Sequence, residues 1–492
     1  VADLLFFFET DCPTCRLMAP YLNAFGSRVE GISQDSPEET DAFVRQLGVR
    51  IPVKVDAGLT LSRHFDPEFV PALYKLDPSG APVQSWIGFA KADLNALAAE
   101  FGLGEVAPAF DGNPAVKPGC TSRHREVAAD AEPGAEPVYI EARRASRIEV
   151  PDSADPWEAA RELCGDPLPV VPPTVERVER LIKASGMAPD HIVALVPPNY
   201  GPATVEKIAA NGVMAGCDPG LMRVLIPLVR AACDERFNLH GVQATTHFAA
   251  PLVILNGSIC KKLELYSKGN AFSNVARSNS TLGRAFQLIL TNIGGARPGE
   301  IDMSTLGNPG KFSYVIAENE EESPWDPLHL ERGIPTHYPG GLTLFAAEPP
   351  RAVSEHTARR ADVVLDAICD NLANVWSPRA CGPFEAFVVI CPEHAKTISR
   401  DGFSKQDVRQ YLWSHTGVPK RRYETPDGGE GTQMRALYEE ISIHGEICYR
   451  KFKNPDQIQI VVCGGTAGKF SAVIGSWATG ERGSQIVTYP IE

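Results

Sequence analysis

The stretch LLFFFETDCPTCRLMAPYLNAF, at residues 4–25, constrains the fold of this chain more than any other. It begins with an apolar run of buried-strand type and continues, through Cys12 and Cys15, into a segment with helical apolar spacing. The first cysteine therefore starts a helix, where free N–H groups and the helix dipole stabilise a thiolate. We predict that Cys12 is the attacking thiolate and that Cys15, one turn inside the helix, is the resolving thiol.

The residues that follow alternate between strand and helix patterns. We expect two strands with a helix between them, then a hairpin, then a closing helix. In order, these elements are expected at 29–35, 36–48, 51–57, 69–88 and 91–102.

Residues 1–104 resemble a thioredoxin-like domain. The resemblance rests on the Cys-x-x-Cys motif, on a proline inside the following helix, and on Val70-Pro71 before a strand. It implies that Pro71 is a cis-proline beside the dithiol and contributes to substrate binding. A thioredoxin fold retained only for packing and half of a zinc site are the alternatives, although no second ligand pair follows.

Residues 105–165 differ in composition, being rich in proline, glycine, alanine and charge, and we predict an interdomain linker. Cys120 lies within it and is followed closely by two arginines and a histidine. Nearby cations lower the pKa of a thiol, so Cys120 is a candidate electron shuttle. The alternative is an incidental surface cysteine.

A heptapeptide occurs almost unchanged at two places, GKFSYVI at 310–316 and GKFSAVI at 468–474. Aligning the two copies gives the order helix, strand, helix, Gly-Lys-Phe-Ser segment in each half. We therefore predict an α/β protein, with a thioredoxin-like fold followed by two diverged α/β repeats about a pseudo-twofold axis. The repeats would span 166–345 and 346–492; chance similarity is the alternative.

The repeated segment also suggests a binding site. Its lysine offers a mobile cation and its serine a hydroxyl group, so two such turns could hold an anionic ligand. The candidate substrate-binding residues are Lys311, Ser313, Lys469 and Ser471. A shared core with lysines merely at the surface is the alternative.

Further polar residues lie at the ends of expected strands. Four of them precede a buried strand, where α/β proteins commonly bind ligands: Gln243, Thr245, Thr246 and His247. For His247 a core or capping role is the alternative.

Acidic residues follow the first heptapeptide, and Glu318 and Glu320 are candidates for a general base or for ligands of a divalent metal ion. A solvated acidic loop is the alternative. Cys217, expected just before a helix, is the best further nucleophile, with a buried structural cysteine as the alternative. Cys260, Cys391 and Cys463 lie on or beside apolar strands and are predicted to be structural.

Four segments, ATVEKIAANGVMAGC, HGVQATTHFAAPLVILNG, GGARPGEIDMSTLGNPGK and AENEEESPWDPLH, are similar to bacterial proteins of the UGSC family of selenoproteins and cysteine homologues. The similarity covers most of 190–345 and, more weakly, the C-terminal half. It implies association with thioredoxin-like partners or fused domains, which fits residues 1–104. The Sec/Cys-Gly-Ser-Cys string of the family is absent, and CTSRH at 120 is its nearest counterpart.

Composition excludes several classes of function. The net charge of −14 disfavours nucleic acid as a partner, and no apolar run reaches membrane-spanning length. The string CGGTAGKFS lacks the first glycine and the Ser or Thr of a P-loop. Twelve cysteines, mostly scattered, fit a reducing compartment, so we expect a cytoplasmic protein.

These observations favour a thiol-dependent oxidoreductase. Cys12 and Cys15 would supply electrons to a small anionic or sulfur-containing substrate held between the two repeats. The alternatives are a lyase or sulfur transferase, in which the dithiol regenerates a cysteine such as Cys217, and a protein that binds soft metals or thiols. The expected partners are the substrate and a cellular thiol reductant; a homo-oligomer is left open, and no cofactor is predicted besides the divalent metal considered above.

Overall fold

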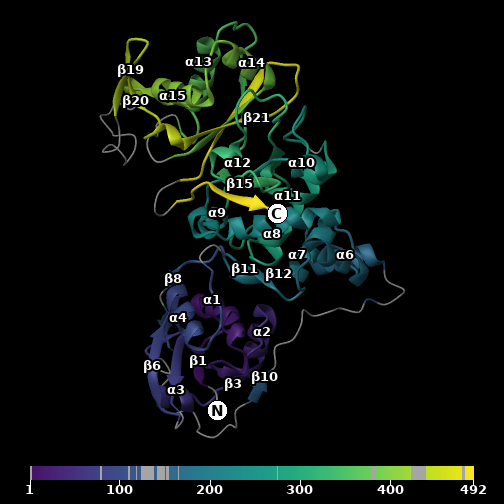
Figure 1. The fold of residues 1–492 in the computed structure, drawn as a ribbon, viewed down its shortest axis with the longest axis vertical. Helices are drawn as coiled ribbons and strands as arrows, with labels where there is room; N and C mark the ends of the chain where they lie inside the picture. Colours follow the sequence, from purple (N-terminus) through teal and green to yellow (C-terminus); the bar gives the residue numbers. More distant parts are fainter. Residues whose placement is uncertain are drawn as a thin grey trace.

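The computed structural model describes residues 3–77, 80–108, 111–117, 119–122, 138–140, 150, 155–164, 166–273, 275–377, 384–422, 439–478 and 483–492. Figure 1 shows an N-terminal unit, in purple and blue, below a larger C-terminal unit.

The N-terminal unit is built on a six-stranded sheet in the order β10-β3-β2-β1-β5-β6. Strands β1, β2 and β3 are parallel, whereas β5 and β6 run antiparallel to their neighbours. This is the topology of a thioredoxin-like fold, as predicted. The elements are β1 Leu4–Phe8, α1 Pro13–Leu22, β2 Val29–Ser33, α2 Pro37–Leu47, β3 Val53–Val55, α3 Thr60–Phe65, β4 Phe69–Val70, β5 Ala72–Leu76, β6 Pro82–Ile87, β7 Phe89–Ala90, α4 Lys91–Glu100, β8 Val116–Lys117, β9 Cys120–Thr121 and β10 Val138–Ile140.

Local sequence explains the main elements of this unit. All five residues of β1 are buried, because the strand lies inside the sheet with helices over it. Helix α2 begins with a capping box between Ser36 and Glu39 and ends at Gly48, which has a φ of 61° that L side chains rarely adopt.

The predicted linker departs from a simple connector. Strand β8 pairs with β7, β9 pairs with β4, and β10 adds to the edge of the main sheet beside β3. The N-terminal unit therefore extends beyond residue 104, as far as Ile140. Composition alone missed this because short added strands need little apolar sequence of their own.

The C-terminal unit contains two four-stranded sheets, ordered β14-β13-β15-β23 and β16-β22-β17-β21. Its elements are α5 Pro156–Cys164, α6 Val175–Ser185, β11 Ile192–Val196, β12 Gly201–Thr204, α7 Val205–Ala215, α8 Met222–Ala232, α9 Leu239–Ala244, β13 Ala250–Asn256, α10 Ile259–Lys262, α11 Arg277–Asn292, β14 Val315–Ala317, α12 Leu328–Glu331, β15 Gly340–Ala347, β16 Arg351–Ser354, α13 Ala361–Leu372, β17 Ala386–Ile390, α14 Pro392–Arg400, α15 Lys405–His415, β18 Gly417–Pro419, β19 Glu440–Ile443, β20 Glu446–Arg450, β21 Ile458–Val462, β22 Phe470–Gly475 and β23 Val487–Ile491.

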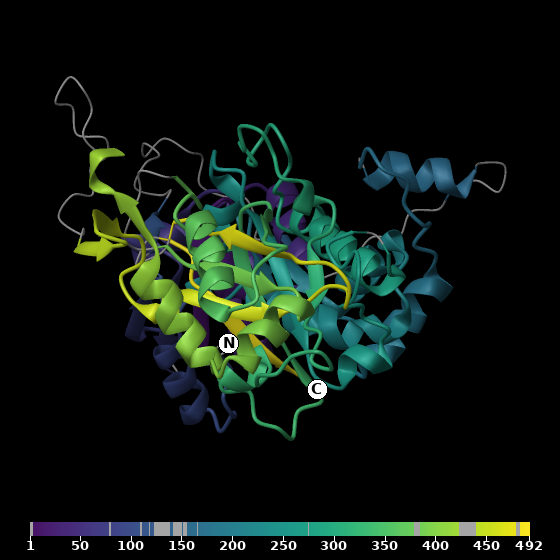
Figure 2. The ribbon, with the colours of Figure 1, turned by 90° about the horizontal axis from the view of Figure 1, so that it is seen from above.

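The two sheets pack face to face through a shared apolar core, in which the rings of Phe345 and Phe387 lie 4.9 Å apart. Helices α7, α8 and α11 cover the outer face of the first sheet, and α13, α14 and α15 cover that of the second. The result is a layered α/β unit, viewed from above in Figure 2.

The two sheets have the same topology. Strand β13 is parallel to β14 and antiparallel to β15, which is antiparallel to β23. Strand β17 is likewise parallel to β21 and antiparallel to β22, which is antiparallel to β16. The fourth strand of each sheet directly follows the third strand of the other sheet in the chain: β16 follows β15, and β23 follows β22.

The heptapeptides do not occupy equivalent places in these sheets. The first leads into β14, an edge strand, whereas the second leads into β22, an inner strand that corresponds to β15. The alignment on which the repeats were predicted is therefore wrong in register. Duplication stays a prediction, with the common strand order rather than the heptapeptide in its favour.

No helix within the described ranges is long and apolar enough to cross a membrane.

Candidate functional site

Cys12 and Cys15 lie where the motif predicts, at the start of α1. Cys12 is the N-cap residue, and its Sγ accepts a hydrogen bond from the backbone N–H of Cys15 at 3.4 Å. The same thiol contacts the carbonyl oxygen of Val70 at 3.5 Å, and the peptide bond from Val70 to Pro71 is cis. Cys12, Cys15 and the loop before Pro71 thus form one site.

The two thiols of this site differ in environment. Cys15 is fully buried, and this burial, together with its neighbour Cys12, raises the pKa of the Cys15 thiol. Cys12 is 3% exposed and lies at the helix N-terminus, where the backbone N–H of Cys15 points at its sulfur. A protonated inner thiol behind an outer thiol at a helix start suits a resolving and an attacking cysteine.

Residues 119–122, which belong to the predicted linker, run alongside this dithiol. In the β4–β9 pair the backbone of Cys120 lies opposite Val70. A Cβ on Gly119 would come within 2.7 Å of the carbonyl oxygen of Val70, so glycine permits this close approach. Ser122 anchors the segment by a hydrogen bond with Gln34 at 2.8 Å. The side chain of Cys120 lies outside the described part of the structure, so its shuttle role stays a prediction.

A second cluster lies at the end of β17 in the C-terminal unit. Cys391 is the N-cap residue of α14, and its backbone N–H donates to Ser471 Oγ at 3.1 Å. Nδ1 of His394, one turn into α14, lies 2.8 Å from the same Ser471 hydroxyl. His394 Nε2 lies 2.9 Å from the carbonyl oxygen of Glu355, which can only accept, so Nε2 carries a proton.

The electrostatics of this cluster favour a thiolate. Burial alone would raise the pKa of Cys391, but hydrogen bonds from the His394 side chain and backbone, together with Ser471, hold it below its ordinary value. Burial would lower the pKa of His394, yet its contacts with Cys391 and with the carbonyl of Glu355 raise it. The pair is therefore biased toward thiolate and imidazolium.

Cys391 and Ser471 line a pocket of about 610 Å³, and Cys463 lines the same pocket. Phe272 and Phe470, which are 39% and 58% exposed, also line it. The pocket thus brings two cysteines and a hydroxyl group together at the ends of β17 and β21.

The contacts of Cys391 with Ser471 and His394 therefore argue against the prediction that this cysteine is merely structural. The signal was present in CPEH, a cysteine that ends an apolar strand, then a proline at helix position N1 and a histidine one turn later. The same argument from a helix start identified Cys12. Ser471, predicted for anion binding, instead contacts this cysteine and histidine.

Cys217 was the predicted second nucleophile, and its surroundings argue against that role. Its Sγ donates to the carbonyl oxygen of Thr281 at 3.3 Å, and burial raises its pKa to about 12. A short 3-10 turn at Pro219–Leu221 separates it from α8, so it does not start that helix. Burial outweighs the stabilisation that Thr281 and Arg277 would give to a thiolate here.

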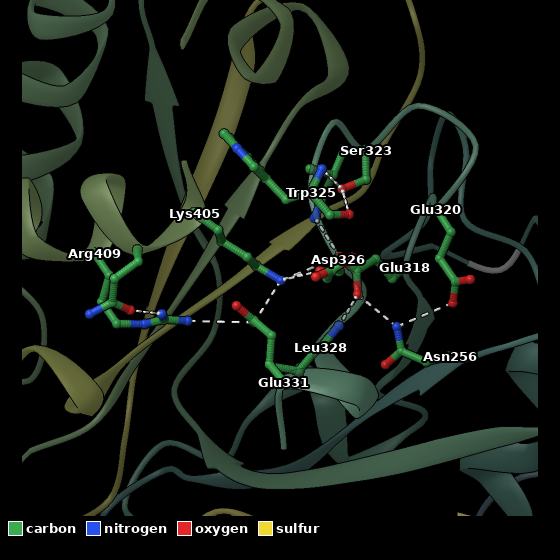
Figure 3. Close-up of polar contacts among 12 residues, drawn as sticks. Asn256, Glu318, Glu320, Ser323, Trp325, Asp326, Leu328, Glu331, Lys405 and Arg409 are labelled. Atoms are coloured by element: carbon green, nitrogen blue, oxygen red, sulfur yellow. Dashed lines mark hydrogen bonds and ion pairs between the residues drawn. The ribbon is translucent and has the colours of Figure 1, made fainter. Parts of the chain in front are cut away.

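Glu318 lies at the end of β14 inside a polar network (Figure 3). Its carboxylate accepts from Asn256 Nδ2 at 2.6 Å and from the backbone N–H of Leu328 at 2.9 Å. Burial raises its pKa, which the cation of Lys405 and these hydrogen bonds partly oppose. Glu320 accepts from the N–H of Gly257 at 2.6 Å. Both carboxylates have internal partners, which favours a structural role over a general base.

The two repeated lysines have separate partners. Lys311 forms an ion pair with Asp302 at 2.5 Å, and Lys469 donates to the carbonyl oxygen of His356 at 3.2 Å. Ser313 donates to the carbonyl oxygen of Asn279 at 3.1 Å. Because Lys311 is already neutralised by Asp302, a shared anion site between the lysines has no support in these contacts.

The polar residues before β13 form a small network of their own. Nε2 of His247 lies 3.2 Å from Glu348, and Thr245 Oγ1 accepts from the indole N–H of Trp477 at 3.1 Å. Gln243 is buried in α9, and the carbonyl oxygen of Thr246 accepts from the backbone N–H of Thr305 at 2.9 Å. Their predicted contact with a substrate stays a prediction. Within the described ranges no three His, Cys, Asp or Glu side chains are grouped to hold a metal ion.

Comparisons with known proteins add little to this geometry. No family model and no curated protein matches the chain, so the resemblance to the UGSC family has no support from them. A protein of Chlorobium tepidum described as a thiol:disulfide interchange protein, DsbE, is 22% identical over 20% of this chain and 75% of its own, with a TM-score of 0.19. StoA of Bacillus subtilis is 17% identical over 18% of this chain and 75% of its own, with a TM-score of 0.17.

Proposed function

We propose that the chain is a thiol–disulfide oxidoreductase in which Cys12 attacks and Cys15 resolves. The observation that carries the proposal is the pairing of Cys12, at the start of α1 and against the Val70 carbonyl, with a buried Cys15 of raised pKa. Nucleophilic attack needs a thiolate that can reach its target, while the resolving thiol must stay protonated until the mixed disulfide forms.

The proposed electron flow runs from a cellular thiol reductant, through Cys12 and Cys15, to a sulfur-containing substrate. Attack by Cys12 on a disulfide forms a mixed disulfide and releases one thiol. Attack by Cys15 then closes the Cys12–Cys15 disulfide and releases the second thiol. The reductant returns the pair to two thiols, so electrons and protons balance over the cycle.

A lyase or sulfur transferase that uses Cys217 is less well supported, because burial raises the pKa of that thiol to about 12. The argument for an anionic substrate also fails, because Lys311 is paired with Asp302.

The test uses the full-length chain, reduced and then mixed with a fluorescent disulfide peptide. Cys12→Ser is expected to abolish turnover at the N-terminal dithiol. Cys15→Ser/Cys120→Ser is expected to leave Cys12 in a mixed disulfide with the peptide, identified by peptide mapping. Cys369→Ser is the matched control, because Cys369 is a buried cysteine of α13 whose pKa is raised to about 12. Unmodified Cys12 in the Cys15→Ser/Cys120→Ser protein would refute the proposal.

A further inference from the structure

We propose that Cys391 and Cys463 form a second redox-active dithiol, which reduces small uncharged disulfides in the pocket at the ends of β17 and β21. The two cysteines are 72 positions apart in sequence, from 391 to 463, and only the sheet brings them together.

The pairing of β17 with β21 makes Cys391 and Cys463 neighbours. Strands β17 and β21 are parallel, with Ile390 opposite Val462 as their last pair, and the N–H of Cys463 donates to the carbonyl oxygen of Ile390 at 3.1 Å. Each cysteine is therefore the first residue after its strand. Adjacent strands lie about 4.8 Å apart, which is inside the range of Cα separations, about 4.4–6.8 Å, that a disulfide spans.

The first sheet shows what side chains at these two positions can do. There the N–H of Glu318 donates to the carbonyl oxygen of Leu255, as Cys463 does to Ile390, so Asn256 and Glu318 are the equivalents of Cys391 and Cys463. The side chains of Asn256 and Glu318 touch, with Nδ2 and Oε2 2.6 Å apart. Side chains at the equivalent positions of the second sheet can thus approach one another.

The two thiols differ in pKa, as an attacking and a resolving cysteine should. The thiol of Cys391 is held in a thiolate-favouring contact with His394 and Ser471, whereas burial raises the pKa of Cys463 to about 12. Cys463 Sγ donates to the carbonyl oxygens of Ser267 and Ala317 in the reduced protein, so it turns about χ1 to reach Cys391. Cys391 is the attacking and Cys463 the resolving cysteine.

The pocket selects the class of disulfide. Around it, the described residues contribute glycine, alanine, proline and valine backbones and side chains, two phenylalanines, Asn270, two serines and the two thiols, but no Lys, Arg, Asp, Glu or His. A charged substrate would lose hydration there without gaining a counter-charge, whereas an uncharged one would not.

The reaction balances without a further reagent. The Cys391 thiolate attacks one sulfur of RS–SR, an S–S bond breaks, and the leaving thiolate takes a proton from the Ser471 hydroxyl, which His394 Nδ1, 2.8 Å away, replaces. The thiol of Cys463 then passes its proton back to His394 through Ser471 and attacks Cys391 Sγ, which releases a second thiolate. That thiolate takes the same proton, so RSSR and two cysteine thiols become two RSH and one Cys391–Cys463 disulfide.

This dithiol is separate from the first one. Figure 1 shows α1 in the lower unit and α14 at the top of the molecule, with the first sheet of the C-terminal unit between them. Direct exchange between the two pairs is therefore impossible in this arrangement, and Cys391 and Cys463 react independently of Cys12 and Cys15.

The test uses the full-length Cys12→Ser/Cys15→Ser protein, reduced and then mixed with bis(2-hydroxyethyl) disulfide. Peptide mapping is expected to show a Cys391–Cys463 disulfide. Added Cys463→Ser should stop the reaction at a mixed disulfide on Cys391, and added Cys391→Ser should leave Cys463 a free thiol. Dithiodipropionate, its charged counterpart, should react roughly tenfold more slowly or worse, because its carboxylates lose hydration in the pocket.

His394→Gln separates the proton-transfer and charge-stabilising role of His394 from a structural one. It should move the pH profile of Cys391 modification to higher pH and leave the rate at high pH unchanged. Cys369→Ser is the control and should change nothing. A Cys391 that stays unmodified, or that pairs with another cysteine, overturns the dithiol; equal rates with both reagents overturn the substrate class. Because mapping of the protein with Cys391 and Cys463 intact already decides the dithiol, a misfolded Cys463→Ser variant does not remove the test.

Discussion

Glu318 and Cys463 occupy equivalent strand ends in the two sheets, and each reaches the backbone of the opposite sheet. Glu318 Oε1 accepts from the N–H of Val462 at 3.4 Å, and Cys463 Sγ donates to the carbonyl oxygen of Ala317 at 3.2 Å. Asn319 adds a backbone hydrogen bond to Val462 at 2.7 Å. The ends of β14 and β21 are thus tied together where the two sheets meet.

This relationship predicts a large effect of Glu318→Ala on stability. The substitution removes the acceptor for Asn256 and Leu328 and leaves Lys405, itself 5% exposed, with Glu331 as its remaining ion-pair partner. Breaking a buried charged network typically lowers the free energy of unfolding by about 3–5 kcal/mol. Urea unfolding measures the loss.

Glu321→Ala is the control for this prediction. Glu321 belongs to the same acidic run but is exposed and pairs with Lys261 on the surface. Its removal should leave the free energy of unfolding, measured with urea, unchanged. Equal destabilisation by both substitutions would contradict the structural role assigned to Glu318.

Cys120 gives a second prediction, because the β4–β9 register sets its backbone opposite Val70, the residue whose carbonyl contacts Cys12. In Cys15→Ser protein treated with hydroxyethyl disulfide, Cys12 first carries the reagent. Cys120 should then displace it, giving a Cys12–Cys120 disulfide and free mercaptoethanol. Peptide mapping detects this bond.

The Cys15→Ser/Cys120→Ser protein is the comparison for that experiment. It should keep the reagent on Cys12, because the competing thiol is gone. A reagent that persists on Cys12 while Cys120 is present would show that Cys120 is no shuttle.

The two repeated lysines give a third prediction. Lys311→Met leaves Asp302, which is 8% exposed, without its ion-pair partner, so we expect a loss of about 1–3 kcal/mol in the free energy of unfolding. Lys469→Met removes only a hydrogen bond to a carbonyl oxygen near the surface and should be neutral. Thermal unfolding of the two variants compares them directly, and a matched loss in both would restore the equivalence of the heptapeptides.

The sequence predicted those features that depend only on residues close together in the chain. The strand and the Cys12 helix start are encoded within short stretches, and both are present. The cis bond before Pro71 was implied by the resemblance to thioredoxin-like domains, and it is present too. Cys391 and Ser471 meet only through the pairing of β17 with β22, which no local pattern specifies.

The errors have the same origin. Near-identity of two heptapeptides suggested equivalent strands, yet β14 pairs in parallel at an edge and β22 pairs on both sides inside its sheet. The position of Cys217 before a helix in the sequence predicted a thiolate, whereas burial raises the pKa of its thiol. Burial and strand order depend on how the whole chain folds, so local sequence patterns do not predict them.

Glu385 gives a prediction about pH. It precedes β17, and its Oε2 accepts from the N–H of Ile486 at 3.3 Å. Burial raises its pKa to about 7, against the opposing cation of Arg332. A carboxyl group with a raised pKa binds its proton more tightly in the folded state than in the unfolded state. Its contribution to stability is therefore greatest below the ordinary pKa of glutamate and is lost as the pH rises to about 7.

Glu385→Gln should remove this dependence, because an amide has no proton to lose. Relative to Glu385→Gln, the unmodified protein should lose up to about 3 kcal/mol of unfolding free energy between acidic pH and pH 8, since each unit of pKa shift corresponds to about 1.4 kcal/mol. Urea unfolding at several pH values measures the difference between the two proteins, in which other titrating groups cancel. Glu446→Gln, at a more exposed site on β20, is the control and should leave the difference constant. A difference that grows in the opposite direction would mean that Glu385 is ionised and held by Arg332 in the folded protein.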